Sequence, residues 1–105
     1  LNVPLARGAA SAEFRSVVEK QWLPRLEAFK PQFVFFSAGF DAHRDDDIGG
    51  LALVDEDYTW CTEQIKLLAE RHAQGHIVSL LEGGYNLDAL ARSVAAHVRI
   101  LAGAI

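Results

Sequence analysis

Two short apolar runs constrain the fold of this chain more than any other feature of its sequence. They are Phe33-Val34-Phe35-Phe36 and His76-Ile77-Val78-Ser79-Leu80-Leu81. A run of large apolar residues without polar alternation predicts a strand that is buried on both faces of a sheet. We therefore expect two such strands, with helices before, between and after them.

The helical segments are expected from apolar residues at helical spacing. The first covers residues 11–29, and Pro24 should kink or split it. The second begins at Asp55 as the N-cap and stops at Gly75, and the third follows a cap at Asn86. This order predicts an α/β fold in which the two strands are parallel and joined by a right-handed crossover.

Parallel strands release their loops at the same end of the sheet, which is where ligand sites form in α/β proteins. The loop containing Asp41 and the turn Gly83-Gly84-Tyr85 should therefore meet. A carboxylate just past a buried strand, such as Asp41, suits a metal ligand or a general base. A loop-capping aspartate is an equally open interpretation.

Other residues near these two segments have two interpretations each. His43 stands two residues from Asp41, but an ordinary loop residue is the simpler interpretation, and solvated carboxylates account for most of the run 45–47. The two glycines allow a ligand to approach the backbone closely. Tyr85 after them either packs or donates its hydroxyl to a developing oxyanion.

Composition narrows the classes of function. Half of the residues are apolar, which excludes disorder, and a net charge of −4 without a basic stripe argues against direct nucleic-acid binding. The single cysteine, Cys61, has no partner in the chain, so a reducing compartment is expected. The sequence lacks an apolar run of membrane-spanning length. We therefore expect a cytoplasmic protein without membrane contact.

Taken together, the motifs resemble the histone deacetylase and acetylpolyamine deacetylase superfamily, most closely its class II and bacterial members. The matching stretches are Asn2-Val3-Pro4-Leu5 with Gly8, Phe29-Lys30-Pro31-Gln32, Ser37-Ala38-Gly39-Phe40-Asp41-Ala42-His43 and Leu81-Glu82-Gly83-Gly84-Tyr85-Asn86. The resemblance implies that residues 1–105 are a C-terminal fragment of a deacetylase catalytic domain. It also implies a three-layer αβα fold with a parallel sheet, as in arginases and deacetylases.

The resemblance further implies roles for single residues. Asp41 matches one of three zinc ligands, and the other two, like the catalytic histidines, fall upstream in the family. Tyr85 matches the tyrosine that donates to the substrate carbonyl. Gly83 and Gly84 match the turn that shapes the acetyl pocket, and Ile48 matches an apolar wall of the substrate channel. Asp46 matches a family aspartate, but Asp47 replaces the proline that usually follows it.

The implied function is hydrolysis of an acetyl-lysine-type amide by zinc-activated water. The isolated fragment should be inactive, because one ligand cannot close a zinc site. Ile48 stands where polyamine-preferring relatives carry an acidic gatekeeper, which favours acyl-lysine substrates over acetylpolyamines, although acetylpolyamine deacetylation stays possible. Two further interpretations are open. One is a non-catalytic α/β interaction module, with its sheet edge covered by a partner or by self-association, and the second is an arginase-like hydrolase.

Overall fold

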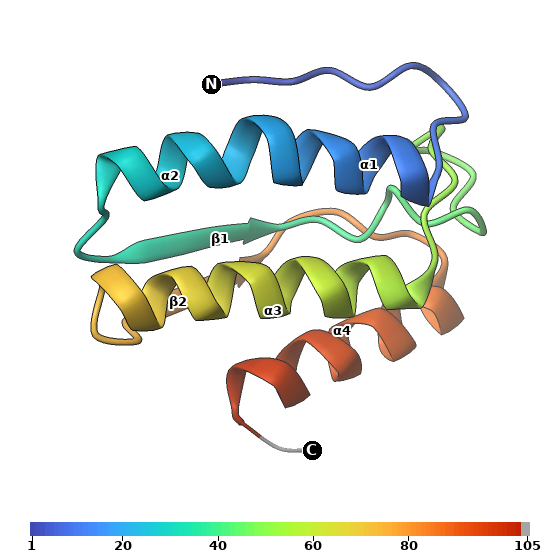
Figure 1. The fold of residues 1–105 in the computed structure, drawn as a ribbon. Helices are drawn as coiled ribbons and strands as arrows, with labels where there is room; N and C mark the ends of the chain where they lie inside the picture. The colour runs from blue at the N-terminus through green and yellow to red at the C-terminus, as the bar shows by residue number, and fades with distance from the viewer. Residues whose placement is uncertain (104–105) are drawn as a thin grey trace.

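A computed structural model describes residues 1–103 of the chain, in which helices pack against a two-stranded sheet (Figure 1). The elements follow the order that the sequence predicts. They are α1 (Ser11–Val17), η1 (Val18–Trp22), α2 (Leu23–Phe29), β1 (Val34–Ala38), α3 (Asp55–His72), β2 (Ile77–Leu81) and α4 (Leu87–Leu101). The strands are parallel, with Val34 opposite Ile77 and Ala38 opposite Leu81.

The first helical segment, which Pro24 is expected to kink or split, is continuous but changes its geometry just before the proline. A π-helical stretch, η1, separates α1 from α2 and ends at Trp22, so that Pro24 falls in the first turn of α2. The backbone stays right-handed helical across both junctions, and the Leu23 N–H donates to the Val18 carbonyl, so a π-helical turn and not a helix end precedes the proline ring. The segment ends at Lys30 in a left-handed conformation, with φ at 54°.

The second predicted helix begins one residue differently from expectation. Asp55 is its first residue rather than its N-cap, which is Val54. The side chain that closes this end is Asp57, which accepts the Val54 N–H at 3.0 Å. Asp57 is fully buried and also accepts the Ser11 hydroxyl at 2.5 Å and Arg15 Nε at 3.0 Å, so it fastens α1 to α3.

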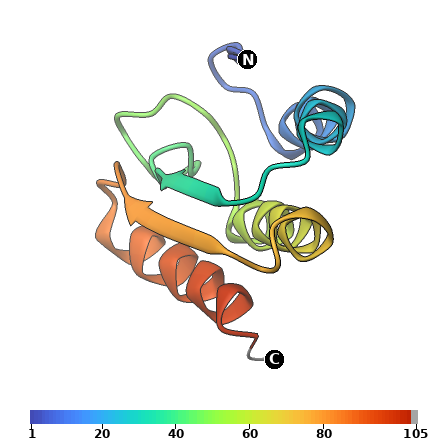
Figure 2. The ribbon, with the colours of Figure 1, turned by 90° about the vertical axis from the view of Figure 1, so that its left-hand side faces the viewer.

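The helices within residues 1–103 lie on one face of the sheet, as Figure 2 shows with the first helical segment and α3 seen nearly end-on. The core between them joins Val18 of η1 to Cys61 and Ile65 of α3, and the inward side chains of Val34 and Phe36 pack against it. Burial of this apolar surface is the main stabilising contribution of the fold.

The other face of the sheet is open within residues 1–103, so this fragment contains the helical layer of one face, and the burial predicted for both faces is met on that face alone. Phe35 is 68% exposed, and Leu80 on β2 is 56% exposed. Parallel pairing places Phe35 opposite Val78 and Ser37 opposite Leu80, which puts these four side chains on one surface. The helices of this chain cover only the opposite surface.

A hydrogen-bond network through His97 connects α4 to α3 and β2. Thr62 Oγ1 donates to the Tyr58 carbonyl at 2.6 Å and therefore accepts from Nδ1 of His97 at 2.8 Å. Nε2 of His97 then accepts the Ser79 hydroxyl at 2.7 Å. Burial lowers the pKa of His97 below its ordinary value, and the neutral ring fits this network.

At its beginning α4 is capped as predicted, with Asn86 Oδ1 accepting the Ala89 N–H at 3.0 Å. None of the helices within residues 1–103 is long and apolar enough to cross a membrane.

Candidate functional site

The loop after β1 and the turn after β2 lie side by side, as the parallel topology predicts. Backbone hydrogen bonds continue past the strands, from Glu82 N to the Ala38 carbonyl at 2.9 Å and from Phe40 N to the Gly83 carbonyl at 2.8 Å. These bonds carry the sheet register into the two irregular segments. Asp41 and the glycine turn therefore start from a rigid support.

Asp41 projects its carboxylate against the glycine turn. A Cβ atom on Gly83 would lie 2.6 Å from Asp41 Oδ2, and one on Gly39 would lie 3.1 Å from Oδ1. The first distance is too short for any contact, so a side chain at position 83 would displace Asp41, whereas the second is a tight contact that a small shift would relieve. The side chain of Asp41 is partly exposed, and among residues 1–103 it accepts no hydrogen bond and forms no ion pair.

The neighbouring His43 side chain is, by contrast, engaged with the protein. His43 is 2% exposed; its Nδ1 accepts the Asp45 N–H at 3.1 Å, and its Nε2 donates to Asp55 Oδ1 at 2.7 Å. Both ring nitrogens are thus occupied. His43 serves as a structural residue of the loop, whereas the Asp41 oxygens are not engaged by the described residues.

Asp55 links this loop to α4. Its Oδ2 accepts a hydrogen bond from Arg92 Nε at 2.9 Å, and its Oδ1 accepts one from His43 Nε2. Burial of Asp55 opposes its ionisation, but the hydrogen bonds from Arg92 and His43 outweigh that effect and lower its pKa. The ionised carboxylate therefore connects the loop to both flanking helices.

Asp46 is the residue near the site that sequence reasoning undervalued. The structure leaves Asp45 and Asp47 exposed but buries Asp46, which is 6% exposed. Its Oδ1 accepts the N–H groups of Ile48 at 2.8 Å and Gly49 at 3.1 Å. Its Oδ2 accepts the N–H of Tyr85 at 2.8 Å. The spacing Asp46-Asp47-Ile48-Gly49 is a signal for such a turn, because aspartate commonly accepts amides two and three residues ahead.

Hydrogen bonding decides the ionisation of Asp46. Its burial opposes the charged form, but the backbone N–H groups, Tyr85 first among them, outweigh burial and lower the pKa of the carboxyl. The group is therefore a carboxylate at neutral pH and offers only acceptors to its neighbours.

Two of the four residues predicted to contact substrate or its carbonyl lie beside this carboxylate. Tyr85 is 57% exposed and Ile48 is 67% exposed, and the amides of both residues bind Asp46. Gly84 has φ at 141°, and a Cβ there would lie 2.7 Å from Leu90 Cδ1. Glycine is required at this position by both its backbone conformation and its close packing.

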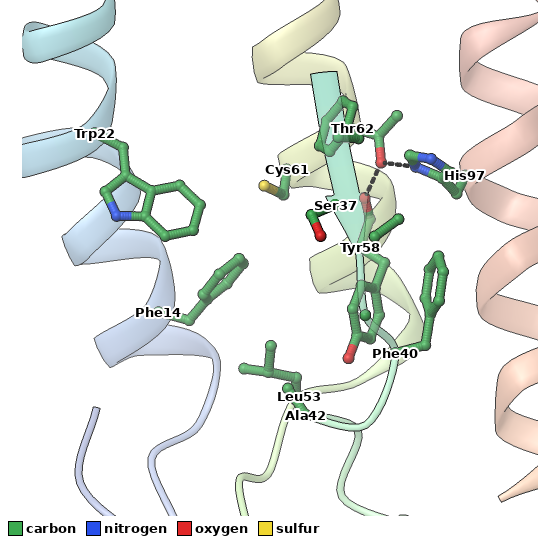
Figure 3. A pocket seen from close by; sticks show the side chains of 13 residues that line it. Phe14, Trp22, Ser37, Phe40, Ala42, Leu53, Tyr58, Cys61, Thr62 and His97 are labelled. Carbon is green, nitrogen blue, oxygen red and sulfur yellow. Dashed lines mark hydrogen bonds between the residues drawn. The ribbon is translucent and has the colours of Figure 1, made fainter. Parts of the chain in front are cut away.

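An apolar cavity of about 160 Å³ lies behind this site, between α1, η1, β1 and α3 (Figure 3). Its walls include Phe14, Trp22, Phe36, Cys61 and Tyr58. Burial, followed by the negative charge of Asp41, raises the pKa of the Tyr58 hydroxyl, so the hydroxyl stays protonated. The lining includes Gly39, Phe40 and Ala42, which flank Asp41, but none of the predicted site residues themselves.

Within residues 1–103, no three His, Cys, Asp or Glu side chains come together in a way that could hold a metal ion. Asp41 is therefore one potential ligand, without a second and third from the described part of this chain.

Comparisons with known proteins agree with this geometry. A family model described as "Histone deacetylase domain" matches residues 1–101. The chain is 45% identical over 104 residues to the type-2 histone deacetylase 2 of Dictyostelium discoideum, covering 96% of this chain and 6% of that protein. It is 40% identical over 103 residues to the chloroplastic histone deacetylase 14 of Arabidopsis thaliana, covering 98% of this chain and 24% of that protein.

Solved structures show the same relationship. The crystal structure of the HDA15 HD domain superposes with a TM-score of 0.90 at 33% identity, covering 99% of this chain and 28% of that chain. The α/β fold with its parallel sheet is thus the one found in these proteins, and the chain spans only a small part of each relative.

Proposed function

The chain belongs to the histone deacetylase family, and we propose that it carries two residues of a zinc-dependent deacetylase active site: the metal ligand Asp41 and the oxyanion donor Tyr85. The substrate would be an amide of the acetyl-lysine type. The observation that carries the proposal is the Asp41 carboxylate, which is free of protein hydrogen bonds within residues 1–103 and lies against the Gly83 turn that leads into Tyr85.

The residues present fit such a metal. Carboxylate oxygens are ordinary zinc ligands, and Asp41 is fixed at the end of a strand with its oxygens unengaged by the described residues. Family resemblance assigns the remaining ligands and the catalytic histidines to parts of the catalytic domain outside these 105 residues. The isolated chain would then bind no zinc of its own and would be inactive.

When bound, zinc would supply an activated water and polarise the amide carbonyl. The groups of this chain would then act on the substrate. The exposed hydroxyl of Tyr85 would donate a hydrogen bond to the carbonyl oxygen as negative charge develops on it. Gly83 and Gly84, which lack a Cβ, would leave room for the acetyl group.

Ile48 would form an apolar wall beside the lysine side chain. Its side chain is exposed, and its amide binds the same carboxylate as that of Tyr85. An apolar residue here would attract a polyamine less than an acidic one, because a carboxylate would pair with the substrate's charged amines. Replacing Ile48 by Glu should therefore raise turnover of an acetylated polyamine relative to an acetyl-lysine peptide.

The proposal is tested by zinc-dependent acetate release from an acetyl-lysine peptide, using the longest native polypeptide that contains this chain. Asp41→Asn should lose zinc affinity, and Tyr85→Phe should keep zinc but lose about 10²- to 10³-fold in kcat. Asp47→Asn removes an exposed carboxylate from the same loop and serves as the control. Turnover that neither Asp41→Asn nor Tyr85→Phe affects would refute both assignments.

The isolated chain offers an independent check. Purified residues 1–105, equilibrated with zinc, should contain much less than one zinc ion per chain. One tightly bound zinc held by this segment alone would contradict the proposal that the ligand set is shared with the rest of the domain.

A further inference from the structure

Asp46 connects the two segments that carry the proposed active-site residues. One carboxylate oxygen, Oδ1, accepts two amides of its own loop, from Ile48 and Gly49. The other oxygen, Oδ2, accepts the amide of Tyr85, which lies 39 residues further along the chain. The carboxylate is buried, so these bonds are shielded from competition with water.

We propose that Asp46 is a positioning residue for Tyr85: by holding the Tyr85 amide, it fixes the direction in which the tyrosine side chain leaves the backbone. This inference rests on the proposed function, in which the Tyr85 hydroxyl donates to the substrate carbonyl.

The other hydrogen bonds of the turn do not fix the direction of the Tyr85 side chain. The Gly83 carbonyl accepts Phe40 N at 2.8 Å and holds the chain before Tyr85. After Tyr85, the Asn86 side chain donates to the Asp45 carbonyl at 3.0 Å. Between these points lies Gly84, which has more backbone conformations open to it than other residues because it lacks a Cβ. The bond to Asp46 is what fixes the peptide between Gly84 and Tyr85.

The hydrogen-bonding chemistry of this carboxylate allows a selective substitution. An asparagine at position 46 would have one acceptor oxygen and one NH₂ donor. Placing its oxygen toward Ile48 and Gly49 satisfies two amides, whereas placing it toward Tyr85 satisfies one. The first orientation should win, so that Asp46→Asn keeps the loop turn and turns a donor toward the Tyr85 N–H.

A second substitution, Asp46→Ser, uses a shorter side chain to separate the hydrogen bonds within the loop from the hydrogen bond to Tyr85. A serine at position 46 can accept amides two and three residues ahead, as serine does in local turns. Its side chain is too short to reach across to the turn after β2. If Asp46→Asn fails to fold, Asp46→Ser therefore tests the same bond.

The experiment uses the longest native polypeptide that contains this chain, with zinc bound, and compares Asp46→Asn, Asp46→Ser and the control Asp47→Asn. In the wild-type background, Asp46→Asn should lower kcat about 10- to 100-fold with little change in KM, since displacement of a catalytic group by about 1 Å has effects of this size. Zinc content should stay at the wild-type level. In a Tyr85→Phe background, where no hydroxyl is left to position, the same substitution should lower kcat less than about threefold.

Hydrogen exchange of the backbone provides a readout that does not depend on turnover. Peptides containing residues 84–86 should exchange faster in Asp46→Asn and Asp46→Ser, because the Tyr85 amide loses its acceptor. Peptides from β1 should exchange as in the wild type, and Asp47→Asn should change neither.

Two different failures are distinguishable. An equal loss of kcat from Asp46→Asn in the wild-type and Tyr85→Phe backgrounds, or unchanged exchange at residues 84–86, overturns the positioning role and leaves the proposed function standing. Turnover that is untouched by Tyr85→Phe overturns the proposed function, and the inference falls with it.

Discussion

The carboxylate of Asp41 lies directly against the α-carbon of Gly83, so that a methyl group on this glycine would come within 2.6 Å of Oδ2. The two residues belong to different segments, and the contact leaves no space between them. The place of the proposed zinc ligand therefore depends on a residue that has no side chain.

Replacing Gly83 by alanine should displace Asp41. We expect zinc affinity to fall by at least about tenfold and kcat/KM to fall with it, since small displacements at a metal ligand weaken coordination. Zinc titration of the native polypeptide, with a chromogenic chelator as competitor, measures the change.

The control for this substitution is Gly75→Ala. Gly75 has φ at 75° and open space around its α-carbon, so alanine there introduces backbone strain without touching the site. It should lower the free energy of unfolding by about 1 kcal/mol and leave zinc affinity unchanged. Equal zinc affinities of Gly83→Ala and Gly75→Ala would contradict the proposed contact.

Asp57→Ala should destabilise the fold strongly. The fully buried carboxylate accepts hydrogen bonds from Ser11, Arg15 and Val54, and its removal leaves three donors without their acceptor. Hydrogen bonds to a charged group contribute about 1.5–3 kcal/mol each, so a loss of several kcal/mol is expected in urea unfolding. The exposed neighbour Glu56 provides the comparison, because Glu56→Ala should change stability by less than about 0.5 kcal/mol.

Acidification below neutral pH should destabilise the native state through His97. Burial lowers the pKa of this histidine in the folded protein, so the unfolded chain takes up its proton first as the pH falls. The contribution of His97 to stability is therefore complete above the unfolded pKa of about 6.5 and is lost progressively as the pH falls below it.

Thermal unfolding between pH 7.5 and 5 measures this effect. His97→Phe should lower Tm at pH 7.5, because Thr62 and Ser79 lose their partner, but its Tm should depend less steeply on pH than that of the wild type. The exposed His76 is the control, and His76→Gln should retain the wild-type slope. A His97→Phe variant with the full wild-type slope would show that another group is responsible.

The isolated 105-residue chain should self-associate through the open face of its sheet. Phe35, Val78 and Leu80 expose adjacent apolar side chains there, and such surfaces pair readily in water. Replacing Phe35 and Leu80 by lysine should shift the chain toward monomer in sedimentation velocity. Leu67→Lys alters an exposed leucine on α3 and should leave association unchanged; a monomeric wild-type chain would refute this prediction.

The sequence predicted the order of elements and the meeting of the two loops because both follow from local apolar patterns and parallel connectivity. Boundaries were less accurate: the cap of α3 is shifted from Asp55 to Val54, since the side chain that closes the helix comes from Asp57. Pattern alone also could not show that the helices cover one face of the sheet only.

For the candidate site, the sequence predicted Asp41 and Tyr85 by position and resemblance, and these roles stay predictions; it assigned Asp46 no structural role. The burial of Asp46 depends on the amide of Tyr85, a contact between distant segments that no local spacing reveals. For His43, local spacing is misleading. Its distance of two residues from Asp41 suggests a metal pair, but both ring nitrogens form hydrogen bonds, with Asp45 and Asp55.

The bond between Asp46 and Tyr85 also bears on how this scaffold can diversify. Asp46 accepts a hydrogen bond from the backbone N–H of residue 85, and this bond does not involve the side chain of that residue. Except for proline, which has no N–H, any residue could replace the tyrosine without loosening the turn. The side chain at position 85 can therefore change during evolution or by design, while the backbone turn that carries it stays the same.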